Sequence, residues 1–437
     1  MKKSLYIAFT VVFFLVCLIP IVGLAVKGPS PAAANEPPVV KPKLKAYDGS
    51  WNMSYLTGWR DYVGKGFYLR LPCITAWDTL CAGLFHTSAN DDVLIGPDNW
   101  LFFGAAANDI SGNGQMTDRE IFCCARSLYL MQEYAEGQGA DFVFTVPCGK
   151  YTLYPAHAPR YVTVAEGSNR ARLMTAMEEQ GVRYADLYAA FSAVDEELYW
   201  QWDSHWNARG AALAADTILG ALGIENGYFS GDFTAAQTHS GDLYAMLYPT
   251  GTALETDYTP EEPFTFSYTS DFHDSDDITI TTEREGAEGT LLLFRDSSGR
   301  NLYPYLADRF GAAHISRLNN YRLDYIAEQG ADTVIVELAE RTLDYLLRFP
   351  AVYPAPERDA ALLDGLQEVE SELTADASGT TMADFMKLTG TLPETAADAC
   401  VYLLAGDALY EAIPNEGSFT AWLPMDTDAG GIRVFAG

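Results

Sequence analysis

An almost uninterrupted apolar run from Leu5 to Val26 constrains this chain more than any other feature of its sequence. The run is as long as the roughly 20 residues that a helix needs to cross the hydrocarbon core of a bilayer. Lys2 and Lys3 precede it, and because basic residues favour the cytoplasmic side, we expect everything after Lys27 to lie outside. Residues 1–26 are therefore predicted to be a single-pass membrane anchor, with its N-terminus inside.

A cleaved signal peptide is the alternative, because Ala32-Ala33-Ala34 resembles a small-residue cleavage site. The apolar region of a signal peptide is shorter, at roughly 7–15 residues, which favours the uncleaved anchor. Residues 27–45 carry five prolines, namely Pro29, Pro31, Pro37, Pro38 and Pro42. This composition predicts an extended linker that holds the following domain off the membrane.

The charge of the chain narrows the range of its partners. With 28 basic and 59 acidic residues, the net charge is -31. Nucleic acid binding requires a concentrated basic surface, so we expect no nucleic acid partner. The same charge disfavours strongly anionic polymers and favours neutral or weakly charged glycans.

Cysteine and histidine spacing gives no support to a metal site or a cofactor. Seven cysteines occur, of which six lie outside the anchor, where disulfides are chemically permitted, but their pairing cannot be deduced from the sequence. Cys123 and Cys124 are adjacent, no C-x-x-C motif is present, and the six histidines lack H-x-x-x-H or H-x-H spacing. We therefore expect neither a metal nor a cofactor.

From about residue 90, short apolar runs alternate with helix-period segments, which predicts an α/β fold with a mostly parallel sheet over residues 46–356. The expected strands are 142–146, 182–187, 291–294 and 333–338, and the expected helices are 119–137, 208–222, 301–310 and 323–329. The segment at about 228–289 is rich in Thr, Tyr, Asp and Gly and predicts a β-rich insertion.

The C-terminal part of the chain predicts a small second unit. Residues 357–380 are acidic and are expected to form a helical connector. Alternating runs in residues 381–437 predict a small β-sandwich-like domain. Its aromatic residues Tyr402, Tyr410 and Trp422 are expected either to pack in the core or to bind carbohydrate.

Two strings carry the chemistry, and the first is Asp203-Ser204-His205-Trp206-Asn207. Asn207 is expected to cap the helix that follows it. In an extended segment Asp203 and His205 project to the same side, because side chains alternate along a strand. A carboxylate there can hold an imidazole in one tautomer, as a general base requires, although an Asp-His pair can also merely cap a helix.

The second string is Leu291 to Asn301, a buried-strand signature that leads through Asp296-Ser297-Ser298-Gly299 into a helix. A serine at the end of a core strand and the start of a helix is exposed at the carboxyl edge of the sheet. The positive end of the helix and free backbone N–H groups there can stabilise an oxyanion. Taken alone, an Asp-Ser turn before a helix is as typical of a simple cap.

Together the two strings resemble the DHHW proteins and the related alginate O-acetylation enzymes, in which an Asp-x-His-Trp motif precedes an Asp-Ser strand-turn-helix. The similarity spans about residues 91–346 and includes the strings at 93–103, 147–155, 240–243 and 337–341. It implies an SGNH-hydrolase-like fold, flavodoxin-like in its sheet, with the motif order permuted relative to ordinary SGNH esterases.

The resemblance assigns roles to individual residues. It makes Ser297 the nucleophile, His205 the general base and Asp203 the residue that orients His205. It also places Lys150 near the rim of the site, and further substrate-binding or oxyanion candidates are Arg295, Ser298, Asn301 and Trp206. Ser298 is the alternative nucleophile, and Asn301 is a candidate side-chain donor to the oxyanion beside the backbone N–H of Ser297.

The chain departs from the family pattern at three positions. Ser204 replaces the first His of the name motif, and Gly149 replaces an Asn before Lys150. Arg295 stands where a Gly usually precedes Asp-Ser, so we expect its side chain to crowd the turn and the oxyanion hole.

The resemblance implies transfer of acetyl groups to or from hydroxyls of an exported polysaccharide through an acyl-serine intermediate. The same three residues serve an esterase and an O-acyltransferase. A tethered extracytoplasmic enzyme is well placed to receive acyl groups from a membrane-embedded acyltransferase partner. The rival hypothesis is a non-catalytic cell-envelope protein that binds glycans on the same scaffold.

Overall fold

The computed structural model describes residues 2–34, 36–163, 165–393 and 398–437. Its centre is a seven-stranded sheet in the order β4-β3-β11-β9-β10-β8-β7. The strands are β3 (Asp141–Thr145), β4 (Tyr184–Ala185), β7 (Ser267–Tyr268), β8 (Thr279–Glu283), β9 (Thr290–Phe294), β10 (Ala312–Ser316) and β11 (Thr333–Glu337). All pairs from β4 to β10 are parallel, whereas β8 and β7 extend the sheet in antiparallel fashion. The predicted α/β fold with a mostly parallel sheet is confirmed.

Side chains of the sheet alternate between two helical layers, because successive residues of a strand point to opposite faces. In β9, Leu292 and Phe294 belong to the core with α5 (Asp118–Gly137) and α7 (Asn169–Gln180). Leu291 and Leu293 belong to a second core, built with α8 (Leu187–Ser192), α9 (Ala208–Ala221) and α11 (Gly299–Ala307). Burial on both faces explains why these strands read as continuous apolar runs.

The predicted β-rich insertion divides into two parts. One part is an antiparallel pair of β5 (Phe233–His239) and β6 (Glu255–Pro260). The segment that connects these two strands contains the helix α10 (Asp242–Leu247). The other part consists of β7 and β8, which belong to the central sheet rather than to a separate unit. The insertion is therefore β-rich but contains one helix that the sequence analysis did not predict.

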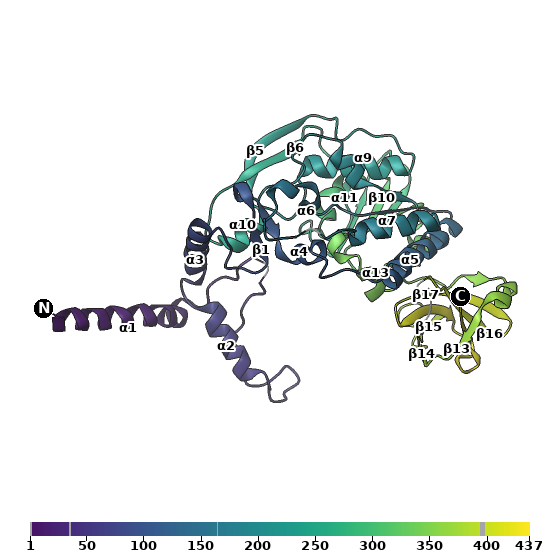
Figure 1. Cartoon of the computed structure of the whole chain (residues 1–437), viewed down its shortest axis with the longest axis horizontal. Coiled ribbons are helices and arrows are strands. Elements are labelled where there is room, and N and C mark those ends of the chain that lie inside the picture. Colours follow the sequence, from purple (N-terminus) through teal and green to yellow (C-terminus); the bar gives the residue numbers. More distant parts are fainter. Residues whose placement is uncertain (1, 35, 164, 394–397) are drawn as a thin grey trace.

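The strands described after residue 356 form a single curved antiparallel sheet, a half-barrel, in the order β13-β19-β16-β17-β18-β15-β14, with β12 paired to β17. Its strands are β12 (Glu357–Arg358), β13 (Gln367–Val369), β14 (Leu373–Asp376), β15 (Phe385–Thr391), β16 (Val401–Ala405), β17 (Ala408–Pro414), β18 (Ser418–Pro424) and β19 (Arg433–Ala436). Figure 1 shows this sheet at the end of the molecule opposite to the N-terminus.

The structure corrects two expectations for this part. Residues 357–380 do not form a helical connector: apart from the short 3-10 helix η4 (Ala360–Gly365), they contain β12, β13 and β14, which pair with the half-barrel. These short strands are largely exposed, so they lack the alternating apolar pattern that would have revealed them. One continuous sheet also replaces the expected sandwich. Of its aromatic residues, Trp422 is buried, and its indole N–H donates to the carbonyl of Ala351.

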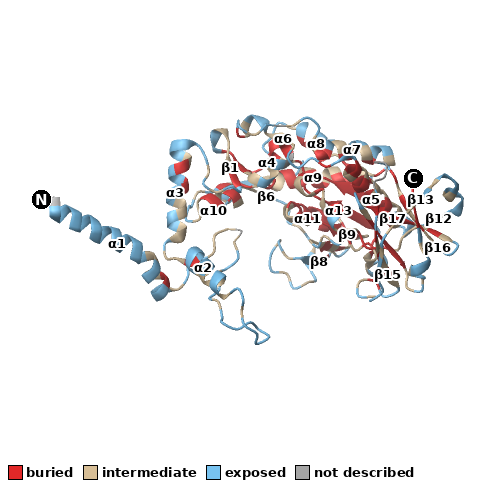
Figure 2. Cartoon of the chain, turned by 60° about the horizontal axis from the view of Figure 1, so that its bottom comes forward, coloured by how far each residue is buried: buried red, intermediate tan, exposed pale blue. Residues whose placement is uncertain are grey.

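The N-terminal helix α1 (Lys2–Lys27) projects away from the rest of the chain and is exposed along almost its whole length (Figure 2). Residues 3–27 are long and apolar enough to cross a membrane. The elements between α1 and the central sheet are α2 (Tyr55–Gly66), α3 (Arg70–Phe85), β1 (Val93–Ile95), β2 (Leu101–Phe103) and α4 (Gly104–Ile110). Helix α1 is thus a candidate membrane anchor or signal segment.

A buried ionic cluster joins the half-barrel to the α/β domain. Glu411 on β17 is almost completely buried and accepts hydrogen bonds from Arg126 of α5 and from Arg358 of β12. Arg358 also pairs with Glu133 of α5. Two guanidinium groups therefore pair with one carboxylate that is shielded from water. Removal of Glu411 should strongly destabilise the fold, because it leaves these charges without that partner.

We predict that Glu411→Ala lowers the free energy of unfolding by about 3–5 kcal/mol, the usual cost of leaving one partner of a buried ion pair without the other. Urea unfolding followed by intrinsic tryptophan fluorescence measures the effect. The control is Glu368→Ala, which removes an ion pair with Arg433 that is about half exposed and should change stability little. Equal losses in the two variants would contradict the prediction.

Candidate active site

Ser297 lies in a tight turn between the end of β9 and the start of α11. Asp296 holds this turn, since its carboxylate accepts hydrogen bonds from the backbone N–H of Ser298 at 2.7 Å and of Ala339 at 2.9 Å. The backbone N–H of Asp296 in turn donates to Glu337 at 2.9 Å. The strand-turn-helix predicted from the sequence is present, and its serine is partly exposed at the carboxyl edge of the parallel sheet.

Glu337, at the end of β11, is fully buried beside this turn. Desolvation raises the pKa of its carboxyl group well above the usual range, and the negative charge of Asp296 adds to the effect. Burial beside Asp296 thus disfavours the charged form of the carboxyl group on which this turn rests.

Asp203 and His205 meet in a turn rather than in the extended segment that we expected. Asp203 accepts hydrogen bonds from the backbone N–H of His205 at 2.9 Å and from its ring Nδ1 at 2.8 Å. The following residues behave as predicted, because the side chain of Asn207 accepts from the backbone N–H groups of Arg209 and Gly210 and caps α9.

The structure brings the three predicted residues together. His205 Nε2 lies 3.1 Å from Ser297 Oγ, while its Nδ1 faces Asp203. Although 92 residues separate His205 from Ser297 in the chain, the three side chains form one continuous line of hydrogen bonds. A serine hydroxyl in this arrangement can pass its proton to the imidazole.

The charges around His205 favour its protonated form. Burial by itself lowers the pKa of His205, but hydrogen bonds to Asp203 and Asp242 outweigh burial and raise the pKa to about 9. Burial also acts against the ionised form of Asp203, yet hydrogen bonds from His205 and His239 hold the pKa of Asp203 well below its usual range. The imidazolium form is thus strongly stabilised in this site.

Two residues of the insertion complete the site, and the sequence analysis gave them no role. Asp242, at the start of α10, accepts from Ser204 Oγ at 2.6 Å and lies 3.4 Å from His205 Nδ1. His239, at the end of β5, places Nε2 2.9 Å from Asp203 and stacks on Trp200. The string 240–243 pointed to this segment only through the family resemblance.

Asp203, His205 and Asp242 lie close enough to be considered as metal ligands. Both oxygens of Asp203 already accept two hydrogen bonds each, from His205 on one side and from His239 and Asp242 on the other. Asp242 likewise accepts from the backbone and the hydroxyl of Ser204. The group fits a hydrogen-bond network better than a metal site.

Arg341 is the third residue that the sequence analysis left without a role. Its Nη2 donates to Ser297 Oγ at 3.3 Å. Arg341 follows β11, and the string 337–341 was noted only as part of the resemblance. A fixed cation beside the serine oxygen is well placed to stabilise negative charge that develops there.

Three of the predicted substrate-binding or oxyanion candidates use their donors inside the protein. Lys150 is buried rather than at the rim, and its Nζ donates to the carbonyls of Leu101, Gln201 and Asp203 at 2.8, 2.8 and 2.9 Å. Burial lowers the pKa of Lys150 to about 7. Arg295 Nη2 donates to the carbonyl of Ser275, and Asn301 Nδ2 donates to the carbonyl of Trp206.

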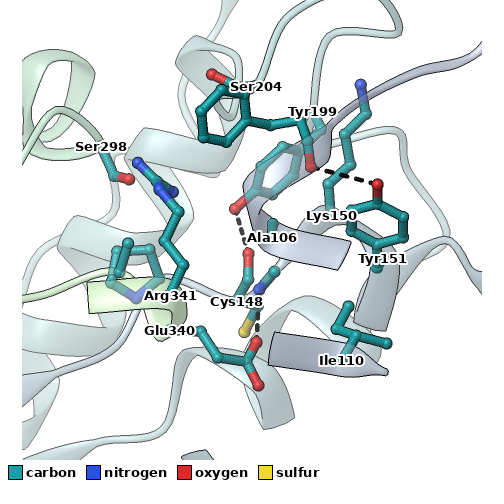
Figure 3. A pocket seen from close by; sticks show the side chains of 14 residues that line it. Ala106, Ile110, Cys148, Lys150, Tyr151, Tyr199, Ser204, Ser298, Glu340 and Arg341 are labelled. Atoms are coloured by element: carbon teal, nitrogen blue, oxygen red, sulfur yellow. Dashed lines mark hydrogen bonds between the residues drawn. The ribbon is translucent and has the colours of Figure 1, made fainter. Parts of the chain in front are cut away.

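The two remaining candidates differ in their position. Trp206 is completely buried and packs on Phe191 and Tyr199, so it supports the site from behind. Ser298 lines a cavity next to the turn, where it lies beside Arg341 (Figure 3). Its position one residue beyond Ser297 leaves Ser297 as the hydroxyl that faces His205.

Two cavities adjoin the Asp203–His205–Ser297 triad. The smaller has a volume of about 40 Å³ and is bounded by Ser204, Ser298 and Arg341 (Figure 3). The larger has a volume of about 300 Å³, and its wall includes Asp203 and His205. The larger cavity is lined further by Trp200, His239, Asp257, Tyr258, Arg300 and Tyr305. The larger cavity thus reaches Asp203 and His205 themselves, whereas the smaller one reaches Ser204 and Ser298, the chain neighbours of His205 and Ser297.

A serine, a histidine and an aspartate in contact at the carboxyl edge of a mostly parallel sheet have the form of an SGNH hydrolase-like domain. Residues 93–283 match the model of the family described as SGNH hydrolase-like domain, acetyltransferase AlgX. The predicted resemblance to the alginate O-acetylation proteins is thereby confirmed. Asp203 and His205 lie within the match, and Ser297 lies beyond it.

Several solved structures are similar to the chain. Bacillus cereus PatB1 with a sulfonyl adduct is 19% identical, with a TM-score of 0.47 over 58% of this chain and 96% of that one. A DHHW family protein from Eubacterium siraeum is 16% identical, with a TM-score of 0.45 over 60% and 97%. The O-acetyltransferase domain of Pseudomonas putida AlgJ is 16% identical, with a TM-score of 0.38 over 58% and 92%. No curated protein matches the chain.

We predict that Asp242→Asn lowers the pKa of His205, because it removes a negative charge 3.4 Å from Nδ1. NMR titration of the protein labelled with ¹³C-histidine measures the pKa, and a His205→Gln variant assigns the signal. As a control, Asp407→Asn removes the same charge from the turn between β16 and β17 and should leave the titration unchanged. An unchanged pKa in Asp242→Asn would show that Asp242 does not act on the imidazole.

Proposed function

We propose that this protein is a membrane-anchored, extracytoplasmic serine O-acyltransferase or esterase that acts on acetyl groups of an exported or cell-envelope polysaccharide. The observation that carries the proposal is the contact of Ser297 Oγ with His205 Nε2 at 3.1 Å, with Asp203 on the other ring nitrogen at 2.8 Å. The match of residues 93–283 to an acetyltransferase family supports the acyl chemistry.

In the first half-reaction, Ser297 Oγ attacks the carbonyl carbon of an acetyl ester while His205 accepts the hydroxyl proton. Asp203 keeps the His205 ring in the tautomer that leaves Nε2 free to accept, and it stabilises the charged ring that results. The oxyanion of the tetrahedral intermediate is stabilised by Arg341 and by the backbone N–H of Ser297. Collapse of the intermediate expels the alcohol, which takes its proton from His205, and leaves acetyl-Ser297.

In the second half-reaction, a hydroxyl group attacks acetyl-Ser297 and passes its proton to His205. Collapse of the second tetrahedral intermediate breaks the bond to Ser297 Oγ, which takes the proton back from His205, and releases the acetylated acceptor. The acceptor is a sugar hydroxyl in a transferase and water in an esterase. We assign the acetyl group to the 40 Å³ cavity beside Ser298 and Arg341. The 300 Å³ cavity, whose wall contains His205, is then the place where the acceptor hydroxyl reaches the base.

The location of the protein follows from α1. We infer that α1 is an uncleaved anchor with Lys2 and Lys3 inside, because residues 3–27 satisfy the length and polarity of a single span. The α/β domain then lies outside the membrane, where an exported polysaccharide is accessible. A membrane-embedded acyltransferase that supplies acetyl groups is the partner that this placement suits.

We predict that the full chain in detergent hydrolyses p-nitrophenyl acetate and that mass spectrometry finds an acetyl adduct on Ser297. Ser297→Ala should abolish both, because no other hydroxyl donates to His205 Nε2 among the described residues. Ser298→Ala is the matched control and should keep the adduct. Background rates and no adduct in the unmodified protein would instead favour a glycan-binding protein on this scaffold.

We predict that Arg341→Gln lowers kcat by about 10²–10³ while changing KM much less, as expected for loss of one oxyanion donor. Steady-state kinetics with p-nitrophenyl acetate separate the two constants. Arg348→Gln, an exposed position on α13 (Tyr345–Arg348), removes an equal charge and should leave kcat unaltered. A change in KM alone would assign Arg341 to substrate binding.

A further inference from the structure

The helix α3 has few charged residues, and its two faces have different surroundings. Among its 16 residues only Arg70 and Asp78 are charged at neutral pH. One face packs on the α/β domain, where Asp78 and Cys81 are buried and Thr75 accepts hydrogen bonds from the backbone and side chain of Thr250. This contact fixes α3 to the domain that carries the triad.

The opposite face of α3 exposes large apolar side chains. Trp77, Leu80 and Leu84 are 57%, 46% and 66% exposed. Together with exposed Cys73 they follow the spacing i, i+4, i+7 and i+11, which places them along one side of a helix. We call Cys73, Trp77, Leu80 and Leu84 the outer face of α3. A contiguous exposed apolar stripe of this kind is typical of a surface that contacts a membrane or another protein.

The start of α3 is fixed beside the outer end of α1. Tyr68, two residues before α3, donates its backbone N–H to the carbonyl of Pro20 at 3.1 Å, and its hydroxyl accepts from Lys27 Nζ at 3.0 Å. Its ring also lies against Gly23, where a Cβ atom would be only 2.3 Å away. Since the candidate span covers residues 3–27, Tyr68 lies beside the last two turns of that span, at its outer end.

The direction of α3 suits a helix on a membrane surface. In the views of Figures 1 and 2, α3 runs crosswise to α1. A spanning helix runs roughly along the membrane normal, so a helix that crosses it near its outer end runs along the surface. Trp77 is also the type of residue that favours the membrane–water boundary.

We infer that the outer face of α3 lies in the outer leaflet of the bilayer, among the lipid chains just below the headgroups. The inference rests on the proposed anchor, because α1 sets the level of the membrane. It replaces our expectation that residues 27–45 hold the domain off the membrane. Because α3 also contacts α10, which begins at Asp242, the triad would be held at a fixed distance from the lipid surface.

Apolar contact, rather than attraction to anionic headgroups, is expected to drive this docking. The net charge of -31 makes the protein as a whole repel an anionic surface. The outer face of α3 itself carries no charged side chain. Neutral phosphatidylcholine is therefore a sufficient lipid for the test, and insertion should follow the apolar area of the face.

Two native thiols provide the test in the full chain. Cys17 lies in α1 and Cys73 in the outer face of α3, and both are exposed. The fluorophore NBD is attached to Cys73 in a Cys17→Ser variant, reconstituted in phosphatidylcholine nanodiscs with or without spin-labelled lipid. We expect blue-shifted emission and quenching by the spin-labelled lipid. NBD on an Asp407→Cys variant that lacks both thiols, in the turn between β16 and β17, should stay unquenched.

The same label on Cys17, in a Cys73→Ser variant, reports the anchor separately. Quenching at both sites supports the inference, and Leu80→Asn with Leu84→Asn should then weaken quenching at Cys73 but not at Cys17. Quenching at Cys17 with a water-exposed Cys73 would overturn the inference and leave the anchor intact, and would favour a protein partner for α3. Water exposure at both sites would overturn the anchor itself.

Discussion

The site depends above all on the carboxylate of Asp203. Its two oxygens accept from the backbone and ring of His205, from His239 and from the backbone N–H of Asp242. Its backbone carbonyl accepts from Lys150. One residue thus joins the Asp-x-His turn, the insertion hairpin, helix α10 and the segment after β3. A buried carboxylate is tolerated because every oxygen lone pair has a donor.

Because His239 and Asp242 both donate to Asp203, the insertion is a structural part of the site. The approach of α10 is so close that a Cβ atom at Gly241 would lie 2.3 Å from the carbonyl of Trp202, so only glycine fits there. Asp242 then reaches both Ser204 and His205. The second carboxylate stabilises the imidazolium form, which favours the transition state over the resting state with neutral histidine. It also adds to the effect of Asp203 in raising the pKa of the resting histidine, so the same contact favours the transition state but disfavours the free base.

The elements that could be predicted from the sequence are those with a local pattern of residues. The residues that were missed owe their roles to tertiary contacts. Strands β3, β9 and β11 were evident from apolar runs, and the family resemblance identified Ser297, His205 and Asp203. Asp242, His239 and Arg341 were missed because their roles arise from contacts with segments 36 to 44 residues away, for which no local signal exists. The edge strands β12 to β14 were missed because exposed strands have no apolar alternation. Lys150 was placed at the rim by the family resemblance alone, whereas three carbonyls hold it inside.

Arg295 illustrates how a departure from the family pattern is accommodated. A large residue before Asp-Ser was expected to crowd the oxyanion hole, yet its guanidinium turns toward the carbonyl of Ser275 and over the ring of Tyr303. In the family pattern a small residue before Asp-Ser leaves space in the turn. Here Gly299 leaves that space, because a Cβ atom at Gly299 would lie 2.6 Å from the side chain of Arg295. The small residue of this turn is therefore Gly299, the first residue of α11, rather than residue 295. The turn therefore keeps its shape, and the oxygen of Ser297 stays open to Arg341 and His205.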